Sequence, residues 1–200
     1  VTLGSLVLAG AGDTMLLVLG VLMSGLGSFA LVAYPRNNIA TEASMKFFVF
    51  ASVTGSVMVF GLSYWFGGTG STLLSDLASL EGKPLIAAVG LIAVIIGLGY
   101  KASLVPFHFW APDAYEGAPV PKIGAIFALA QVVRHLPVTM DWPLIIAVVS
   151  VLSMTYGYLA ALVQDNVVRL LAYSSIAQAG YFLLGMVAVG VSSLAFESMV

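Results

Sequence analysis

The residues best placed to do chemistry are a lysine and a histidine that stand inside an apolar stretch. Lys101 follows the uncharged run 85–100, and His108 lies just beyond Pro106. A lysine at membrane depth costs about 2.5 to 3.5 kcal/mol on insertion scales, so it either snorkels to the membrane surface or serves as a proton or ion site. We expect a proton or ion site, because a proline inside a span breaks the helix, and such breaks are tolerated beside protein or a wet cavity.

Two further residues, His108 and Lys122, leave alternatives open. His108 could face the same cavity as Lys101 across the break, where an imidazole with an unperturbed pKa of about 6.5 can relay protons. It could equally be a histidine packed near the membrane surface. Lys122 begins the apolar run 123–133. Its position alone favours an interfacial lysine over one that points into the helix bundle.

The remaining charged and aromatic residues have simpler interpretations. Asp113 and Glu116 lie in a turn-rich link, where their carboxylates are most simply solvated. Asp165 and Arg169 are four residues apart, a spacing that predicts an ion pair on one helix face. An aromatic belt at the membrane surface would account for the three tryptophans, which stand near the ends of apolar runs: Trp65, Trp110 and Trp142.

The composition excludes several classes of protein. Hydrophobic residues make up 60% of the chain and charged residues 8%, against about 25% charged residues in soluble domains. A formal charge of −2 gives no basic surface for nucleic acid, and the lack of cysteine excludes iron–sulfur clusters and thiolate zinc sites. Haem ligation by His108 and His135 has no further signature. We therefore expect no cofactor in this chain, and electron chemistry only in other chains.

Long uncharged stretches predict the elements that hold these residues. A helix needs about 20 apolar residues to cross a bilayer, and the stretches lack the alternation of barrel strands. We expect an all-α, polytopic transmembrane helix bundle with a proline-broken helix, forming one domain over residues 1–200. The predicted spans are about 14–34, 46–67, 84–104, 121–136, 142–164 and 170–191.

Three segments resemble the antiporter-like subunits of respiratory complex I, and among these most of all subunit N of the bacterial NADH:quinone oxidoreductase. The longest is GYKASLVPFHFWAPDAYEGAP at 99–119; TEASMKFF at 41–48 and DNVVRLLAYSSIAQAGY at 165–181 agree with it. The resemblance extends over nearly all of this chain but only over the middle part of a family member. It implies an antiporter-like fold, and we expect the chain to be the middle of a longer protein.

The resemblance also implies roles for individual residues. Lys101 matches the central lysine of the broken helix, the principal proton carrier, and Lys122 resembles the lysine that passes protons laterally. This replaces the interfacial interpretation of Lys122. His108 belongs to the same motif. The implied function is a proton-translocating membrane-arm subunit, with other membrane-arm subunits, the lipid bilayer and protons as partners. The implied location is the bacterial inner membrane, with the mitochondrial inner membrane as the alternative.

Three positions depart from the family pattern. In a gap-free alignment over 13–34, Leu22 stands where the family usually has a glutamate that pairs with the central lysine. Val168 stands where many members have a lysine, and Pro121 leads directly into Lys122, where members have several more residues. These departures keep two alternatives open: a subunit of a multisubunit cation/proton antiporter, and a structural membrane subunit that has lost transport.

Overall fold

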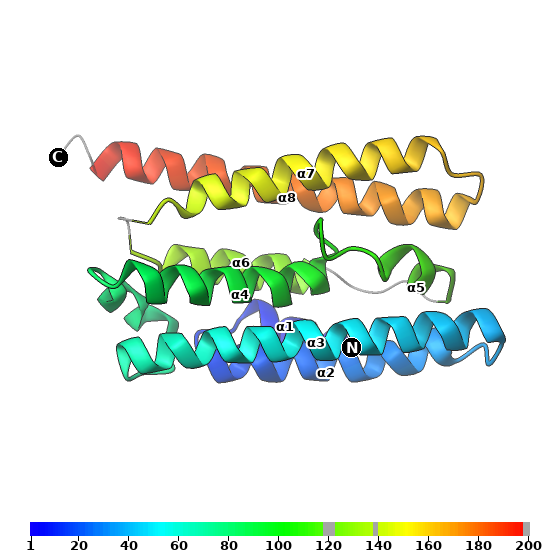
Figure 1. Ribbon diagram of the computed structural model, residues 1–200, viewed down its shortest axis with the longest axis horizontal. Helices are drawn as coiled ribbons and strands as arrows, with labels where there is room; N and C mark the ends of the chain where they lie inside the picture. The colour runs from blue at the N-terminus through cyan, green and yellow to red at the C-terminus, as the bar shows by residue number, and fades with distance from the viewer. Residues whose placement is uncertain (118–122, 138–139, 198–200) are drawn as a thin grey trace.

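The computed structural model describes residues 1–117, 123–137 and 140–197, which form a bundle of helices joined by short loops (Figure 1). Within these ranges there is no β-strand, only one isolated bridge between Asp13 and Leu73. The expected all-α transmembrane bundle is therefore confirmed. The elements are α1 (Thr2–Ala9), α2 (Thr14–Ala33), α3 (Asn38–Thr69), the 3-10 helix η1 (Leu74–Leu80), α4 (Pro84–Ala102), α5 (Ala111–Gly117), α6 (Ile123–Arg134), α7 (Trp142–Leu162) and α8 (Val167–Glu197).

Five of the described helices are long and apolar enough to cross a membrane: α2, α3, α4, α7 and the Val167–Gly190 part of α8. The predicted span 121–136 corresponds to α6, whose described part is shorter than a full crossing. The helix α3 begins at Asn38 rather than at residue 46. It begins there because the Asn37 side chain caps it, accepting a hydrogen bond from the Ala40 amide at 2.7 Å.

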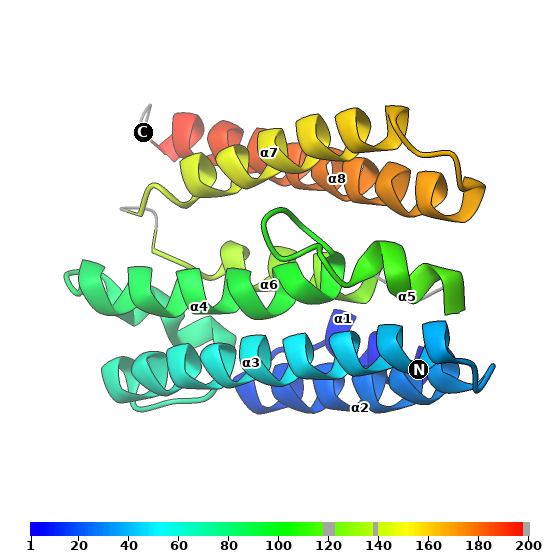
Figure 2. The same ribbon diagram turned by 45° about the vertical axis from the view of Figure 1, so that its right-hand side comes forward.

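The helices are arranged in three layers, and the two views in Figures 1 and 2 agree on this. One layer holds α2 and α3, a second holds α7 and α8, and α4 and α6 lie between them. The short helix α5 follows α4 in this middle layer. Because of this position, 67% of the apolar window of α4 is buried, against 22% to 33% in the other four spans. The span that carries Lys101 is thus the most enclosed.

The tryptophans pack inside the protein rather than forming the predicted belt at the membrane surface. Trp65, Trp110 and Trp142 are 1%, 0% and 8% exposed, so that prediction is wrong. The Trp65 indole donates to the carbonyl of Ala87 at 3.2 Å, and its ring occupies the space that a Cβ on Gly90 would need. Small residues let helices approach closely in membranes. Here the missing side chain of Gly90 on α4 lets Trp65 of α3 pack directly against that helix.

Candidate functional site

The helix that carries Lys101 is broken, as the sequence predicts. It ends because Ser103 adopts a left-handed backbone (φ 59°), after which the amide of Leu104 donates to the carbonyl of Gly99 at 2.7 Å. Pro106, which has no amide hydrogen, follows in the linker. Helical structure resumes in α5 at Ala111.

A buried serine on α7 stabilises the break. Ser153 is 0% exposed, and its Oγ accepts a hydrogen bond at 3.0 Å from the amide of Val105. An unpaired amide in this enclosed position would be costly, so the hydroxyl satisfies the backbone that the break releases. Sequence reasoning missed Ser153, because a serine in an apolar helix gives no signal of a contact with a distant loop.

Lys101 lies in the last turn of α4 and is 3% exposed, so its expected burial is confirmed. Its Nζ lies 5.6 Å from the centroid of the Phe47 ring, within the range of a cation–π contact. Its position at the carboxyl end of a helix also favours a cation. Among the described residues, no hydrogen bond or ion pair reaches this ammonium.

A cavity of about 120 Å³ between α2, α3 and α4 lies beside Lys101. Leu22 lines this cavity, so the residue at the family's glutamate position lies in the same space as the lysine. Its other polar side chains are those of Ser52, Thr54 and Tyr100, whose hydroxyls donate to backbone carbonyls of α3. Lys101 is therefore the one charged residue lining a largely apolar cavity in the described structure.

His108 is also buried, at 2% exposed, but it does not line this cavity. Its ring packs against Tyr156 of α7, with the ring centroids 4.4 Å apart. The idea of a cavity shared with Lys101 is not supported, because the chain turns at the break and carries His108 toward α7. Lys122 lies outside the described residues, so its place in the site stays a prediction.

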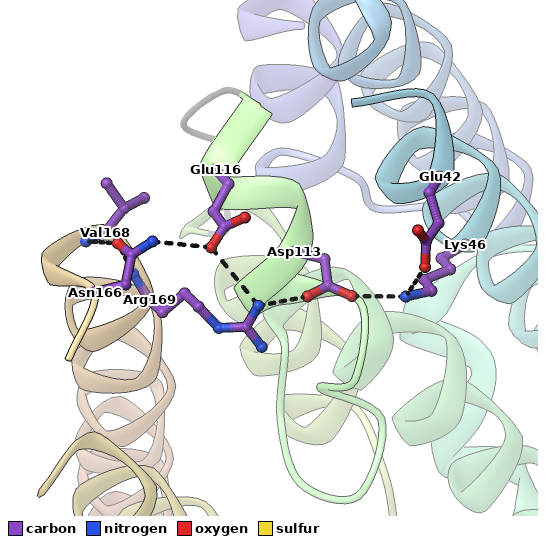
Figure 3. A network of polar contacts seen from close by, with 7 residues as sticks. All are labelled: Glu42, Lys46, Asp113, Glu116, Asn166, Val168 and Arg169. Atoms are coloured by element: carbon purple, nitrogen blue, oxygen red, sulfur yellow. Dashed lines mark hydrogen bonds and ion pairs between the residues drawn. The ribbon is translucent and has the colours of Figure 1, made fainter. Parts of the chain in front are cut away.

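Charged residues at one end of the bundle form what we call the α5 ion network: Glu42, Lys46, Asp113, Glu116 and Arg169 (Figure 3). The Asp113 carboxylate lies 3.1 Å from Lys46 Nζ and 3.1 Å from Arg169 Nη1. Glu42 pairs with Lys46 at 2.7 Å, and Glu116 with Arg169 at 3.6 Å. The network therefore ties α5 to α3 on one side and to α8 on the other.

The α5 ion network corrects two expectations. The carboxylates of Asp113 and Glu116 are ion-paired rather than merely solvated, and Arg169 pairs with them rather than with Asp165. The cause is tertiary, since α5 lies within reach of the first turn of α8. Val168 contributes only its amide, which donates to Asn166 Oδ1 at 2.9 Å.

Comparisons with known proteins agree with this architecture. The family model described as "NADH:quinone oxidoreductase/Mrp antiporter, TM" matches residues 11–200. NADH-quinone oxidoreductase subunit N of Mycobacterium sp. (strain JLS) is 42% identical over 207 residues, covering 98% of this chain and 44% of that protein. The chain thus spans less than half the length of this relative.

Two solved structures are also similar. A chain of respiratory complex I from Thermus thermophilus has a TM-score of 0.80 and 36% identity, covering 92% of this chain and 42% of that one. A chain of the Mrp complex from Dietzia sp. DQ12-45-1b has a TM-score of 0.84 and 22% identity, covering 93% of this chain and 38% of that one. At that identity the second similarity shows the fold alone.

Proposed function

The chain belongs to the NADH:quinone oxidoreductase/Mrp antiporter family of transmembrane proteins, and from this premise we propose that it translocates protons as a membrane-arm subunit of an NADH:quinone oxidoreductase. The observation that carries the proposal is the buried ammonium of Lys101 at the break between α4 and α5. A relative at 42% identity bears the name subunit N of that enzyme. The redox chemistry belongs to other chains of the complex.

Lys101 is the proton carrier in this mechanism. Its ammonium lies in a largely apolar cavity, where no described carboxylate fixes its charge. At an effective dielectric constant of 20, a unit charge 10 Å away changes its energy by about 1.7 kcal/mol, which is more than a tenfold change in the protonation equilibrium. In the proposed mechanism, a change of charge at such a distance shifts the protonation of Lys101, and this shift couples remote redox chemistry to proton transfer.

Lys122 and His108 extend the route. Lys122 passes protons laterally from Lys101, and His108 acts as a further relay on the side of the break that faces α7. His108 is 2% exposed and its ring packs against Tyr156, which places the proposed relay on the α7 side of the break. Since Leu22 supplies no carboxylate to the Lys101 cavity, the charge that tunes Lys101 comes from outside that cavity.

The proposed setting is a multisubunit membrane complex. The partners are other membrane-arm subunits, the lipid bilayer and the transported protons. The solved relatives are chains of multisubunit assemblies, which supports membrane partners for this chain. The proposed location is the bacterial inner membrane, with the mitochondrial inner membrane as the alternative.

Substitution Lys101→Met tests the proposal. We expect NADH-driven proton uptake in reconstituted vesicles to be lost while the complex still assembles, because methionine fills similar space without an ionisable group. The matched control is Lys46→Met, which removes an exposed, ion-paired lysine and should leave proton uptake close to normal. Unchanged uptake in Lys101→Met would refute proton transfer by this residue and favour a structural subunit.

A subunit of a multisubunit cation/proton antiporter is the second candidate function. The shared fold with a chain of the Mrp complex favours it. The chains that copurify after mild detergent extraction, identified by mass, distinguish the two. Peripheral redox subunits support the oxidoreductase, whereas only small membrane partners support the antiporter.

A further inference from the structure

Phe47 of α3 contacts the chain on both sides of the break that follows Lys101. Before the break, the Tyr100 hydroxyl donates to the Phe47 carbonyl at 2.6 Å. After the break, the Trp110 ring stacks on the Phe47 ring, with the ring centroids 4.2 Å apart and an angle of 14° between the ring planes. One residue of α3 thus holds both of the chain segments that the break separates.

Tyr100 and Trp110 are also joined to each other. The Trp110 indole Nε1 donates to the Tyr100 carbonyl at 3.0 Å, and the centroids of the two rings lie 5.2 Å apart. All three side chains are buried, and each pair is in contact, so we call Phe47, Tyr100 and Trp110 the Phe47 cluster. Such a closed set of packed rings and hydrogen bonds leaves the last turn of α4 little freedom to shift against α3.

The Phe47 cluster determines where the Lys101 ammonium lies. Lys101 follows Tyr100 directly, so the cluster fixes the backbone from which the lysine side chain extends. The Lys101 Nζ lies 5.6 Å from the centroid of the Phe47 ring, and both residues line the cavity of about 120 Å³. The face of an aromatic ring attracts a cation, and the attraction is larger where water is excluded. Because a lysine side chain is flexible, this contact selects one place for the ammonium among many.

We infer that Phe47 is a positioning residue for proton transfer by Lys101: its ring holds the ammonium in the cavity, while Tyr100 and Trp110 hold Phe47 in place. The inference rests on the proposed function, in which Lys101 carries the proton. Proton transfer requires a donor and an acceptor within hydrogen-bond reach, directly or through one water. A displaced ammonium therefore transfers its proton more slowly, although every ionisable group is still present.

Leucine substitution tests the contact between the ring and the ammonium. In Phe47→Leu, NADH-driven proton uptake per assembled complex in reconstituted vesicles should fall about tenfold, because small displacements of reacting groups have effects of this size or larger. The matched control is Phe48→Leu, since Phe48 lines the same cavity but its ring packs against Phe29. This control should keep uptake within about twofold of normal. The same fall in both variants would overturn the inference.

Fluorination of the Phe47 ring separates positioning from packing. Phenylalanines with one, two and three ring fluorines keep nearly the same shape, but each fluorine weakens the negative face of the ring. Introduced at position 47 by stop-codon suppression, they should lower proton uptake stepwise, by about threefold for the trifluorinated ring. The same series at position 48 should have no effect. A ring that only filled space would be insensitive to fluorine, so constant uptake along the series at position 47 would overturn the inference.

Tyrosine variants test whether the rest of the Phe47 cluster contributes. Tyr100→Phe keeps the ring but removes the hydroxyl that donates to the Phe47 carbonyl, and it should lower proton uptake about threefold. The matched control is Tyr64→Phe, since Tyr64 also belongs to this part of the bundle but lies on an exposed face of α3. Thermal unfolding of both variants checks their folding. Normal uptake in Tyr100→Phe would contradict the role of the cluster in holding Phe47.

Lys101→Met, measured in the same vesicles, separates this inference from the proposed function. If Lys101→Met abolishes proton uptake while Phe47→Leu and the fluorinated rings leave it normal, the positioning role fails and the proposed function stands. If Lys101→Met itself leaves uptake normal, the proposed function fails and the positioning role fails with it. Loss of uptake in Lys101→Met together with the graded losses at position 47 supports both.

Discussion

Two lysines of this chain lie in opposite environments. The Lys46 side chain is 45% exposed and pairs with the carboxylates of Glu42 and Asp113. Lys101 is 3% exposed and pairs with no carboxylate among the described residues. Where water reaches the charges, opposite charges pair and hold helices in place at a modest gain. Where water is excluded, an unpaired charge responds strongly to its surroundings, which suits it to proton transfer.

The largest effect that we predict is a loss of stability when the packing near Lys101 is disrupted. Trp110 is fully buried, stacks on Phe47 with ring centroids 4.2 Å apart, and donates to the carbonyl of Tyr100 at 3.0 Å. Trp110→Ala should lower the free energy of unfolding by about 3 kcal/mol, through the cavity it leaves. Thermal unfolding in detergent measures this, with the half-exposed Phe48→Ala as control. Equal losses in the two variants would contradict the packing argument.

The second prediction compares the two lysines directly. Lys101→Met should raise the free energy of unfolding by about 2 kcal/mol, because it removes a buried, unpaired charge. Lys46→Met should lower it only slightly, because the two ion pairs that are lost are exposed to solvent. Chemical denaturation of both variants checks the opposite signs. A loss of stability in both variants would mean that other groups offset the cost of burying the Lys101 charge.

The third prediction concerns the α5 ion network. Asp113→Asn weakens the contacts of α5 with both Lys46 and Arg169 and should lower the free energy of unfolding by about 1 kcal/mol. The difference should shrink in high salt, because these charges are partly exposed. Asp165→Asn should have almost no effect, since Arg169 pairs with α5. A larger effect at Asp165 would support the ion pair between Asp165 and Arg169 that the sequence alone predicts, and would contradict the pairing of Arg169 with α5.

The smallest effect concerns Asp13, a partly exposed charge just before the start of α2. The hydrogen bond from the Thr72 hydroxyl, and then that from the Met15 amide, hold the pKa of the Asp13 carboxylate below its usual range. A carboxylate with a lowered pKa in the folded state contributes stability above its unfolded pKa of about 3.9 and loses it as the pH falls through the folded value. Asp13→Asn should thus be less stable than the unsubstituted protein at neutral pH, with the difference vanishing in acid. Denaturation at several pH values tests this, and a difference that grows in acid would contradict it.

Much of the fold could be predicted because membrane insertion depends on local composition. The spans of α2, α4 and α7 end within two residues of the predicted ranges, and the break after Lys101 follows from Pro106. The charged residues Glu42 and Lys46 misled the prediction for α3. They form an ion pair along the first turns of that helix, so its helical part extends beyond the uncharged run.

The candidate site was only partly predictable. The burial of Lys101 follows from its apolar neighbours in the chain. The side of the bundle on which the His108 side chain lies does not. The helical spacing between the two residues holds only for an unbroken helix, and the turn after Ala102 carries His108 to α7. Ser153 was missed for a related reason, because its role depends on a backbone amide in a distant segment.

The sequence by itself determined that this is a helical membrane protein with a broken span and a buried lysine, because hydrophobic length and proline act locally. Only the tertiary structure decided the partners of Arg169, the burial of the tryptophans and the cavity beside Lys101. Helices that are apolar on every side carry no periodic signal of which face meets which neighbour. Such contacts depend on how the helices are rotated and stacked against one another, and that is fixed only when the whole bundle packs.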